Sequence, residues 1–252
     1  MFLDASPATA PPSIDVALDN GGDGSDLSDV RESVVDPPRP LLRRLAFPVA
    51  VSLLLQLVIA AGERLPSVDG TAYFEAGRNL LGGNGFTRRG DPELHFPPLT
   101  PIALGGLVRI TGSELAALRT CNLSCGLLVL AAIILLARQI WKDDDTTVVA
   151  AWLGGTVAGL IPLFSRQGGG SESISVATLL FAAYFAIRAL SSGTSERRRL
   201  LGLAAAGLAV GLSYLARPES LLPGAILGAG VAFDALRRPG SIVDRGRRLV
   251  LW

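Results

Sequence analysis

Long apolar blocks constrain this chain more than any other feature of its sequence. They recur from residue 45 onward, and most run for about 18 residues or more. At 1.5 Å per residue of helix, such a block is long enough to cross a hydrocarbon core of roughly 30 Å. Apolar residues make up 49% of the chain, and its mean hydropathy is +0.44. These features exclude a water-soluble enzyme, a secreted disulfide scaffold and a coiled coil, and they predict an all-α, polytopic membrane helix bundle.

Charge is distributed unevenly along the chain. Residues 1–38 contain eight acidic residues and one arginine, whereas residues 39–252 contain fourteen acidic and twenty-two basic residues. The first forty residues are rich in Pro, Gly, Ser and Asp and lack apolar periodicity, so we expect residues 1–40 to form a disordered acidic tail. Residues 41–252 form the expected membrane domain. Its first block follows Arg43 and Arg44 and reads as an uncleaved signal anchor, with cleavage after Ala60 as the alternative.

Block 98–112 decides the topology. Whether this block crosses the membrane determines on which side every later loop lies. If it does not cross, the arginine-rich segments fall together on one side, which the positive-inside rule assigns to the cytoplasm. If it crosses, everything after it inverts and most basic residues fall outside. The block is also short and begins among prolines, which is typical of a re-entrant or surface-lying helix.

We therefore predict six spans, a cytoplasmic N-terminus and one outer loop from about residue 63 to 115. The predicted spans are 45–62, 116–137, 147–164, 174–190, 200–216 and 220–236. Within the outer loop we expect juxtamembrane helices at about 70–82 and 98–112. The expected location is the plasma membrane of a bacterium.

Small residues inside the spans are expected to serve packing. Three Gly-x-x-x-Gly pairs allow helix backbones to approach closely: Gly155/Gly159, Gly207/Gly211 and Gly224/Gly228. Cys121 and Cys125 lie one turn apart in an apolar block, where thiols behave as small hydrophobic groups. Gly82 and Gly83 are expected to end the first juxtamembrane helix.

Asp69 is the first polar residue of interest after the first span. Asp is a preferred N-cap, so one interpretation is that Asp69 begins the helix that ends at Gly82. The other is a carboxylate at the water–lipid boundary, where partial desolvation raises the pKa of an acid and suits it to general base catalysis. One residue can do both, and the sequence alone leaves the two interpretations open.

Other charged residues cluster at the predicted outer face. Glu93 and the only histidine, His95, lie in a proline-bounded loop directly before block 98–112. Glu172 and Glu219 each fall in a first helical turn, where a negative charge favours the helix dipole. Arg166 and Arg217 lie on the arginine-poor side near helix starts, where a base is electrostatically unfavourable. Retained cations at this face suggest an anionic ligand.

These motifs, taken in order, resemble a known family. They are Val68-Asp69-Gly70-x-x-Tyr73-Phe74, Gly83-Asn84-Gly85-Phe86-Thr87, His95-Phe96-Pro97-Pro98, Ser171-Glu172 and Ala216-Arg217-Pro218-Glu219. The pattern is similar to that of membrane-embedded GT-C glycosyltransferases of the dolichyl-phosphate-mannose–protein mannosyltransferase type and their bacterial relatives, including the lipid A aminoarabinose transferases. The resemblance extends from about residue 45 to the end of the sequence.

The resemblance implies transfer of a sugar from a polyprenyl-phosphate donor to a glycan, lipid or protein acceptor on the outer face of the membrane. It implies that Asp69 is the general base and that Arg217 pairs with the carrier phosphate. The implied donor-binding set is Tyr73, Arg78, Glu93, His95, Arg166, Glu172, Arg217 and Glu219. Membrane lipids are expected neighbours and nucleic acid is not an expected partner. Metal dependence varies in this superfamily, and no metal cluster is evident in the sequence.

Relatives are usually about twice this length, so the chain resembles only their N-terminal half. We therefore expect either a fragment or a chain that needs a partner to complete its bundle. Two alternatives to a glycosyltransferase remain at this stage: a non-catalytic relative that acts as an assembly subunit, and a multi-span transporter or lipid-handling protein. Transporters usually carry charges near the bilayer midplane, whereas the charges here cluster at one surface.

Overall fold

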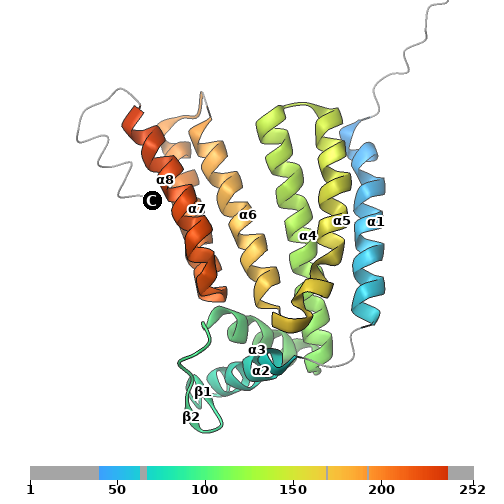
Figure 1. Ribbon diagram of the computed structural model, residues 1–252, viewed down its shortest axis with the longest axis vertical. Helices are drawn as coiled ribbons and strands as arrows, with labels where there is room; N and C mark the ends of the chain where they lie inside the picture. The colour runs from blue at the N-terminus through green and yellow to red at the C-terminus, as the bar shows by residue number, and fades with distance from the viewer. Residues whose placement is uncertain (1–39, 63–66, 169, 192, 238–252) are drawn as a thin grey trace, which may run out of the picture. The chain divides into compact units, whose positions relative to one another are not determined.

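The computed structural model is a bundle of α-helices, as predicted from the apolar blocks (Figure 1). It describes residues 40–62, 67–168, 170–191 and 193–237, without the side chains of 161–169, and these residues belong to one compact unit that begins at Arg39. The long helices are α1 (Leu41–Ala61), α4 (Glu114–Trp141), α5 (Asp144–Gly168), α6 (Ser171–Leu190), α7 (Glu196–Ala216) and α8 (Leu221–Arg237). The predicted acidic tail lies outside the described residues.

Five described segments are long and apolar enough to cross a membrane. They are Leu41–Ala61, Glu114–Trp141, Ser171–Leu190, Glu196–Ala216 and Pro218–Arg237, the last of which joins the 3₁₀ turn Pro218–Ser220 to α8. The protein is therefore an all-α, polytopic membrane protein. The sixth predicted span, 147–164, lies within α5, which has 25 residues. The number of helices that cross the membrane stays a prediction.

Only two to five residues separate α4 from α5, α5 from α6 and α6 from α7, and consecutive long helices run in opposite directions (Figure 1). One end of the bundle, which we name the basic end, contains the start of α1, the end of α4, the start of α5, the end of α6, the start of α7 and the end of α8. Its described basic residues are Arg43, Arg44, Arg138, Lys142, Arg188, Arg197, Arg198, Arg199 and Arg237. We name the opposite end of the bundle the loop end.

Two short helices lie at the loop end, α2 (Val68–Leu81) and α3 (Leu99–Thr111), joined through a hairpin of β1 (Thr87–Arg88) and β2 (Asp91–Pro92) (Figure 1). The 13 residues of α3 span about 20 Å at 1.5 Å per residue, which is less than the hydrocarbon core. Gly77 of α2 and Gly105 of α3 permit close contact of the two helices, because a Cβ on Gly77 would lie 2.1 Å from the carbonyl oxygen of Pro101.

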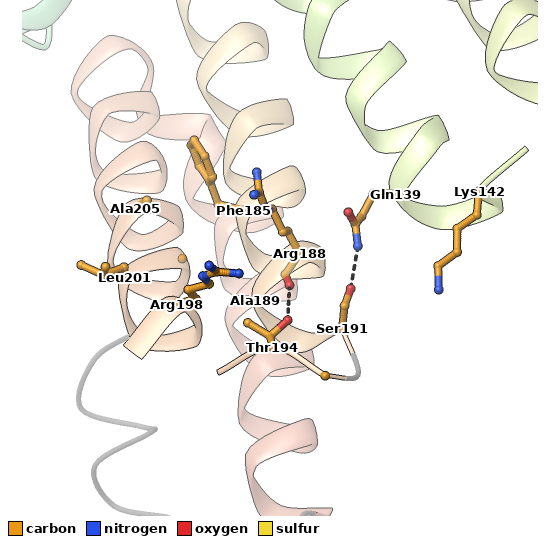
Figure 2. Close-up of a pocket in the computed structure, with 12 residues that line it drawn as sticks. Gln139, Lys142, Phe185, Arg188, Ala189, Ser191, Thr194, Arg198, Leu201 and Ala205 are labelled. Carbon is orange, nitrogen blue, oxygen red and sulfur yellow. Dashed lines mark hydrogen bonds between the residues drawn. The ribbon is translucent and has the colours of Figure 1, made fainter. Parts of the chain in front are cut away.

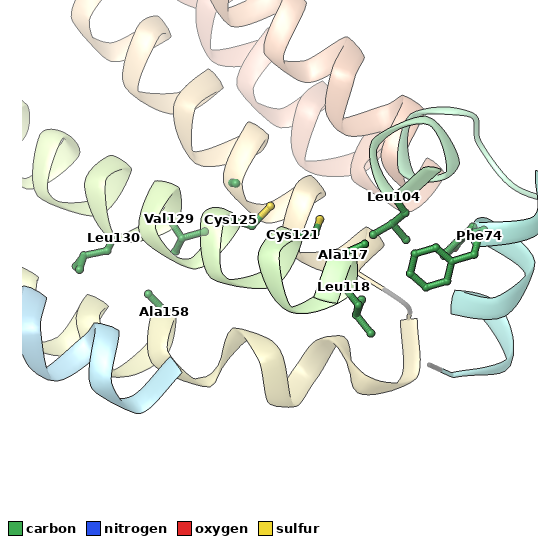
Figure 3. Packing of buried hydrophobic residues seen from close by; sticks show 11 residues of the cluster. Phe74, Leu104, Ala117, Leu118, Cys121, Cys125, Val129, Leu130 and Ala158 are labelled. Atoms are coloured by element: carbon green, nitrogen blue, oxygen red, sulfur yellow. The ribbon is translucent and has the colours of Figure 1, made fainter. Parts of the chain in front are cut away.

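The main apolar core runs from the loop end along α4 (Figure 3). Phe74 of α2 and Leu104 of α3 are fully buried beside Leu118, at the start of α4. Cys121 and Cys125 are buried in the same cluster, which confirms that they pack as small hydrophobic groups. The core therefore fixes α2 and α3 to the start of α4.

The glycine pairs have different outcomes. Gly155 and Gly159 face α1, where added Cβ atoms would lie 3.3 Å from the carbonyl oxygen of Pro48 and 2.6 Å from Leu55, so close packing is confirmed there. A Cβ on Gly224 would meet Val210 of α7 at 2.6 Å. The prediction that Gly211 permits close helix packing is wrong, because a Cβ at this position would meet nothing within 4 Å. Spacing alone does not determine which face of a helix meets a neighbour.

Candidate functional site

A pocket of about 300 Å³ lies at the loop end and gathers residues from four parts of the chain. Its lining residues come from the start of α2, the loop before α3, the start of α6 and the turn between α7 and α8. They are Asp69, Tyr73, His95, Phe96, Pro97, Ser171, Glu172, Ala216, Arg217, Pro218 and Glu219. The fold thus brings together five of the residues predicted from sequence to bind the donor, and it adds the proposed base.

Asp69 is not the N-cap of α2, so the capping interpretation is wrong. The helix begins at Val68, two residues earlier than that interpretation requires, and Ser67 is its N-cap. The Ser67 hydroxyl accepts a hydrogen bond from the backbone N–H of Gly70 at 3.0 Å. Asp69 lies in the first turn, half-buried, with its side chain at the pocket. Its carboxylate is therefore not required for capping.

Arg217 is held between two carboxylates. Its guanidinium forms an ion pair with Glu172 of α6, and its Nε lies 3.3 Å from Oε2 of Glu219. Partial burial alone lowers the pKa of an arginine, but the hydrogen bond and charge of Glu172, together with Glu219, raise the pKa of Arg217 above its ordinary value. The charged lining residues are then one cation and three acids, Asp69 included.

The position of Arg217 follows from how α7 ends. Arg217 has an extended backbone, with φ −156° and ψ 117°, between the last residue of α7 and the 3₁₀ turn that starts at Pro218. Thr100 at the start of α3 donates a hydrogen bond to the carbonyl oxygen of Ala216 at 3.3 Å. This contact joins the juxtamembrane layer to the end of α7, and it fixes the backbone that presents Arg217.

Tyr73 is a buried residue that lines the pocket. Its ring packs edge-on against Phe96, with centroids 4.7 Å apart. Burial raises the pKa of Tyr73 above its ordinary value of 10, and the charges of Asp69 and Glu172 act in the same direction, against a hydrogen bond with Ser171 and the charge of Arg217. The phenol therefore stays protonated and neutral at ordinary pH.

Glu93 is not among the residues that line the pocket. It is 6% exposed, and its carboxylate accepts hydrogen bonds from the backbone N–H groups of His95 (2.7 Å) and Phe96 (3.3 Å). Arg88 pairs with its other oxygen at 2.8 Å. The carboxylate is thus fully used in shaping the loop that carries His95, so the prediction that Glu93 binds the donor directly is not supported by its position.

Arg78, which was also predicted to bind the donor, is not among the described residues that line the pocket. Arg78 of α2 forms an ion pair with Glu114 at the start of α4, with its Nη2 2.8 Å from the carboxylate. This places Arg78 outside the pocket and gives it a structural partner. Arg166 lies near the end of α5, and its side chain is outside the described part of the structure. The position of Arg78 therefore does not support donor binding, and the prediction for Arg166 lies outside the described side chains.

Sequence reasoning missed five pocket residues that have no ionisable side chain: Phe96, Pro97, Ser171, Ala216 and Pro218. Each belongs to a motif that the sequence already singled out, but only the ionisable members of those motifs were selected. Ser171 is buried and its hydroxyl donates a hydrogen bond to Glu172 at 3.3 Å. Gly170 precedes it with φ +94°, a left-handed backbone that favours glycine and lets α6 begin at Ser171.

The described residues gather no group of three or more His, Cys, Asp or Glu side chains that could hold a metal ion. In the pocket, the guanidinium of Arg217 contacts both Glu172 and Glu219. The arrangement offers a half-buried carboxylate, a neutral phenol, an exposed imidazole and a guanidinium. These groups can remove a proton, donate hydrogen bonds and pair with an anion.

Comparison with known protein families gave one match. The model for dolichyl-phosphate-mannose-protein mannosyltransferases matches residues 95–241, which is more than half of the chain. The matched segment includes His95, Glu172 and Arg217, whereas Asp69 and Tyr73 precede it. Searches of curated proteins and of solved structures each gave no match. The chain belongs to the dolichyl-phosphate-mannose-protein mannosyltransferase family, a family of membrane glycosyltransferases.

Proposed function

We propose that this protein transfers a sugar from a polyprenyl-phosphate carrier to an acceptor hydroxyl or amine at the loop end of the bundle. The observation that supports this proposal best is the pocket itself. Asp69 and Arg217 are far apart in the sequence, but both line this pocket at the loop end, where Arg217 is ion-paired with Glu172. A lipid-linked phosphate donor needs cations at the level of the headgroups and a carboxylate near the acceptor, and it needs no nucleotide fold.

In the proposed reaction the acceptor oxygen or nitrogen attacks the anomeric carbon while Asp69 takes the acceptor's proton. The bond between the anomeric carbon and the phosphate oxygen breaks, and its electron pair stays on the carrier phosphate. A single displacement of this kind inverts the configuration at the anomeric carbon. The half-buried position of Asp69 at the pocket supports its role as the base.

Arg217 is the proposed partner of the carrier phosphate. The charged lining residues are three acids and one arginine, so the pocket repels a phosphate unless one carboxylate moves away from Arg217. Glu219 is the group that we expect to move, because its side chain is 70% exposed and its oxygen lies 3.3 Å from Arg217. Glu172, with a side chain 27% exposed, then keeps the guanidinium oriented. Tyr73 and His95 supply hydrogen bonds to the sugar.

We further propose that the basic end faces the cytoplasm and that the pocket opens on the outer face of a bacterial plasma membrane. The concentration of arginine at the basic end supports this orientation. Single cysteines at Leu94, which is 91% exposed, and at Arg197, which is also exposed, test it by labelling in intact cells. An impermeant thiol reagent should label position 94 alone. Labelling of position 197 alone would refute the orientation.

Asp69→Asn tests the mechanism, with Asp91→Asn as its matched control. Asp91 is an exposed carboxylate of the same loop region that does not line the pocket. In membranes supplied with polyprenyl-phosphate mannose, Asp69→Asn should reduce transfer by about 100-fold or more, the contribution typical of a general base. Asp91→Asn should leave transfer unchanged. Normal turnover by Asp69→Asn would remove Asp69 from the mechanism.

A transporter is not favoured by the family or by the placement of charge. In the long helices, charged residues lie within two turns of a helix end rather than near the middle. The family is likewise one of transferases, not of assembly subunits. A partner chain that completes the bundle remains compatible with the proposal, and transfer by the purified chain alone would show that none is needed.

A further inference from the structure

A second pocket lies at the basic end, opposite the proposed catalytic pocket. It has a volume of about 610 Å³ and lies among the ends of α4, α6 and α7 (Figure 2). Three cations line it, one from each helix: Lys142 at the end of α4, Arg188 in the last turn of α6 and Arg198 in the first turn of α7. Among the described residues that line it, none is acidic.

These cations differ from two other bases at the same end, which are neutralised by acids. Arg44 pairs with Asp145, and Arg199 pairs with Glu196. Among the ion pairs of the described residues, none involves Lys142, Arg188 or Arg198. Arg188 instead donates a hydrogen bond to the hydroxyl of Tyr184 at 2.8 Å. Three positive charges around one hollow repel each other, so an anion between them would stabilise the arrangement.

The pocket also has an apolar wall that extends toward the middle of the bundle. Phe185 lies one turn before Arg188 in α6, and Leu201 and Ala205 follow Arg198 in α7. Ala205 is seven residues beyond Arg198, which places it about 10 Å deeper along the helix. A hollow with cations at its rim and apolar side chains below has the polarity profile of a phospholipid, with its headgroup above and its acyl chains below.

Hydrogen bonds bridge the helices that form the pocket. Gln139 of α4 donates a hydrogen bond to the hydroxyl of Ser191 at 2.7 Å, and Thr194 donates one to the carbonyl oxygen of Arg188 at 3.3 Å (Figure 2). Gly202 brings α7 close to α6, since a Cβ there would lie 2.9 Å from that of Ala189. These contacts fix the helix ends that form the pocket relative to one another.

We propose that this pocket binds an anionic phospholipid from the leaflet at the basic end, independently of the proposed catalytic function. The phosphate lies among Lys142, Arg188 and Arg198, and an acyl chain lies along Phe185 and Leu201. Basic pockets between membrane helices are suited to anionic headgroups. The segment that follows α8 does not match the pocket in charge, because residues 238–252 contain four arginines and one aspartate.

The test measures lipid binding to the full chain in detergent by native mass spectrometry. The probes are dioleoylphosphatidylglycerol, dioleoylphosphatidylcholine and sn-glycerol 3-phosphate. The pocket variant carries Lys142→Gln, Arg188→Gln and Arg198→Gln. Each cation near a membrane surface contributes about fivefold to binding, so the variant should bind phosphatidylglycerol on the order of 100-fold more weakly.

The control variant removes three exposed cations of the same end that do not line the pocket, by Arg43→Gln, Arg197→Gln and Arg237→Gln. It should keep tight binding of the first phosphatidylglycerol. Equal loss in both variants would show diffuse attraction and overturn the proposal, as would equal binding of phosphatidylcholine. Equally tight binding of sn-glycerol 3-phosphate would replace the lipid by a free phosphate and overturn it too.

A second variant keeps all charges and fills the apolar wall. Ala205 is half-buried in that wall, and Ala205→Leu narrows the space for an acyl chain. It should weaken phosphatidylglycerol binding about tenfold or more without changing the elution profile of the protein. Undiminished binding by Ala205→Leu would place the lipid elsewhere. This variant keeps the proposal testable if the triple variant does not fold.

Discussion

The contact between α2 and α3 offers a sensitive test of how the fold positions the catalytic pocket. A Cβ on Gly77 would lie 2.1 Å from the carbonyl oxygen of Pro101, whereas ordinary contact begins at 3.4 Å. Gly77→Ala therefore has to increase the separation of the two helices by about 1.3 Å at this point. The clashing atom belongs to the backbone of Pro101, so no side-chain rotation can relieve the clash.

The displacement should reach the pocket because Asp69 lies on the same helix, eight residues before Gly77. A misplacement of about 1 Å costs about 100-fold in rate, so sugar transfer by Gly77→Ala should fall by about that factor. Overpacking also costs about 1–3 kcal/mol of stability. For a chain of this size, that corresponds to a fall in Tm of about 2–12 °C.

Gly106→Ala is the matched control, because Gly106 lies in α3 with nothing within 4 Å of an added Cβ. Alanine has a higher helix propensity than glycine, so this variant should be as stable as the parent or more stable. Transfer in membranes and thermal unfolding in detergent provide the two measurements. If Gly77→Ala matched Gly106→Ala in both, the close approach of α2 and α3 would not position Asp69.

Three further variants test single groups. Glu93→Gln removes the charge that pairs with Arg88 and holds the His95 loop, so thermal unfolding should show a loss of about 1–2 kcal/mol, and unchanged stability would contradict this role. The pKa of Tyr73 is raised above its ordinary value of 10, so this phenol does not titrate below pH 10. The pH profile of activity below pH 10 should therefore have the same midpoints in Tyr73→Phe as in the parent protein, and a shifted profile would show that Tyr73 titrates there. The hydrogen bonds that the Asp143 carboxylate accepts from Thr146 lower its pKa, and stability gained this way is present above the ordinary pKa and lost as pH falls through the lowered value. Asp143→Ala should therefore lower Tm more at pH 7 than at pH 2, and an equal difference at both values would contradict the pKa shift.

The sequence determined the membrane character, the helical class and the kinds of residue at the site. Apolar blocks longer than a bilayer leave a helix as the structure that satisfies every backbone hydrogen bond in lipid, so local composition was enough for these conclusions. The short apolar segment at Leu99–Thr111 was likewise identified from its length and prolines. Family membership agreed with motifs that could be read along the chain.

Tertiary structure decided how individual side chains are used. Glu93, Arg78 and Glu172 are all charged residues of the loop end, and nothing in their local sequence separates a loop clamp, a helix-to-helix ion pair and a pocket wall. Those roles depend on which partner from a distant segment lies opposite: Arg88, Glu114 or Arg217. The cap of α2 at Ser67 and the pocket at the basic end also depended on contacts and helix boundaries that spacing does not specify. Composition determines where a helix is stable, but only packing determines which of its faces meets another.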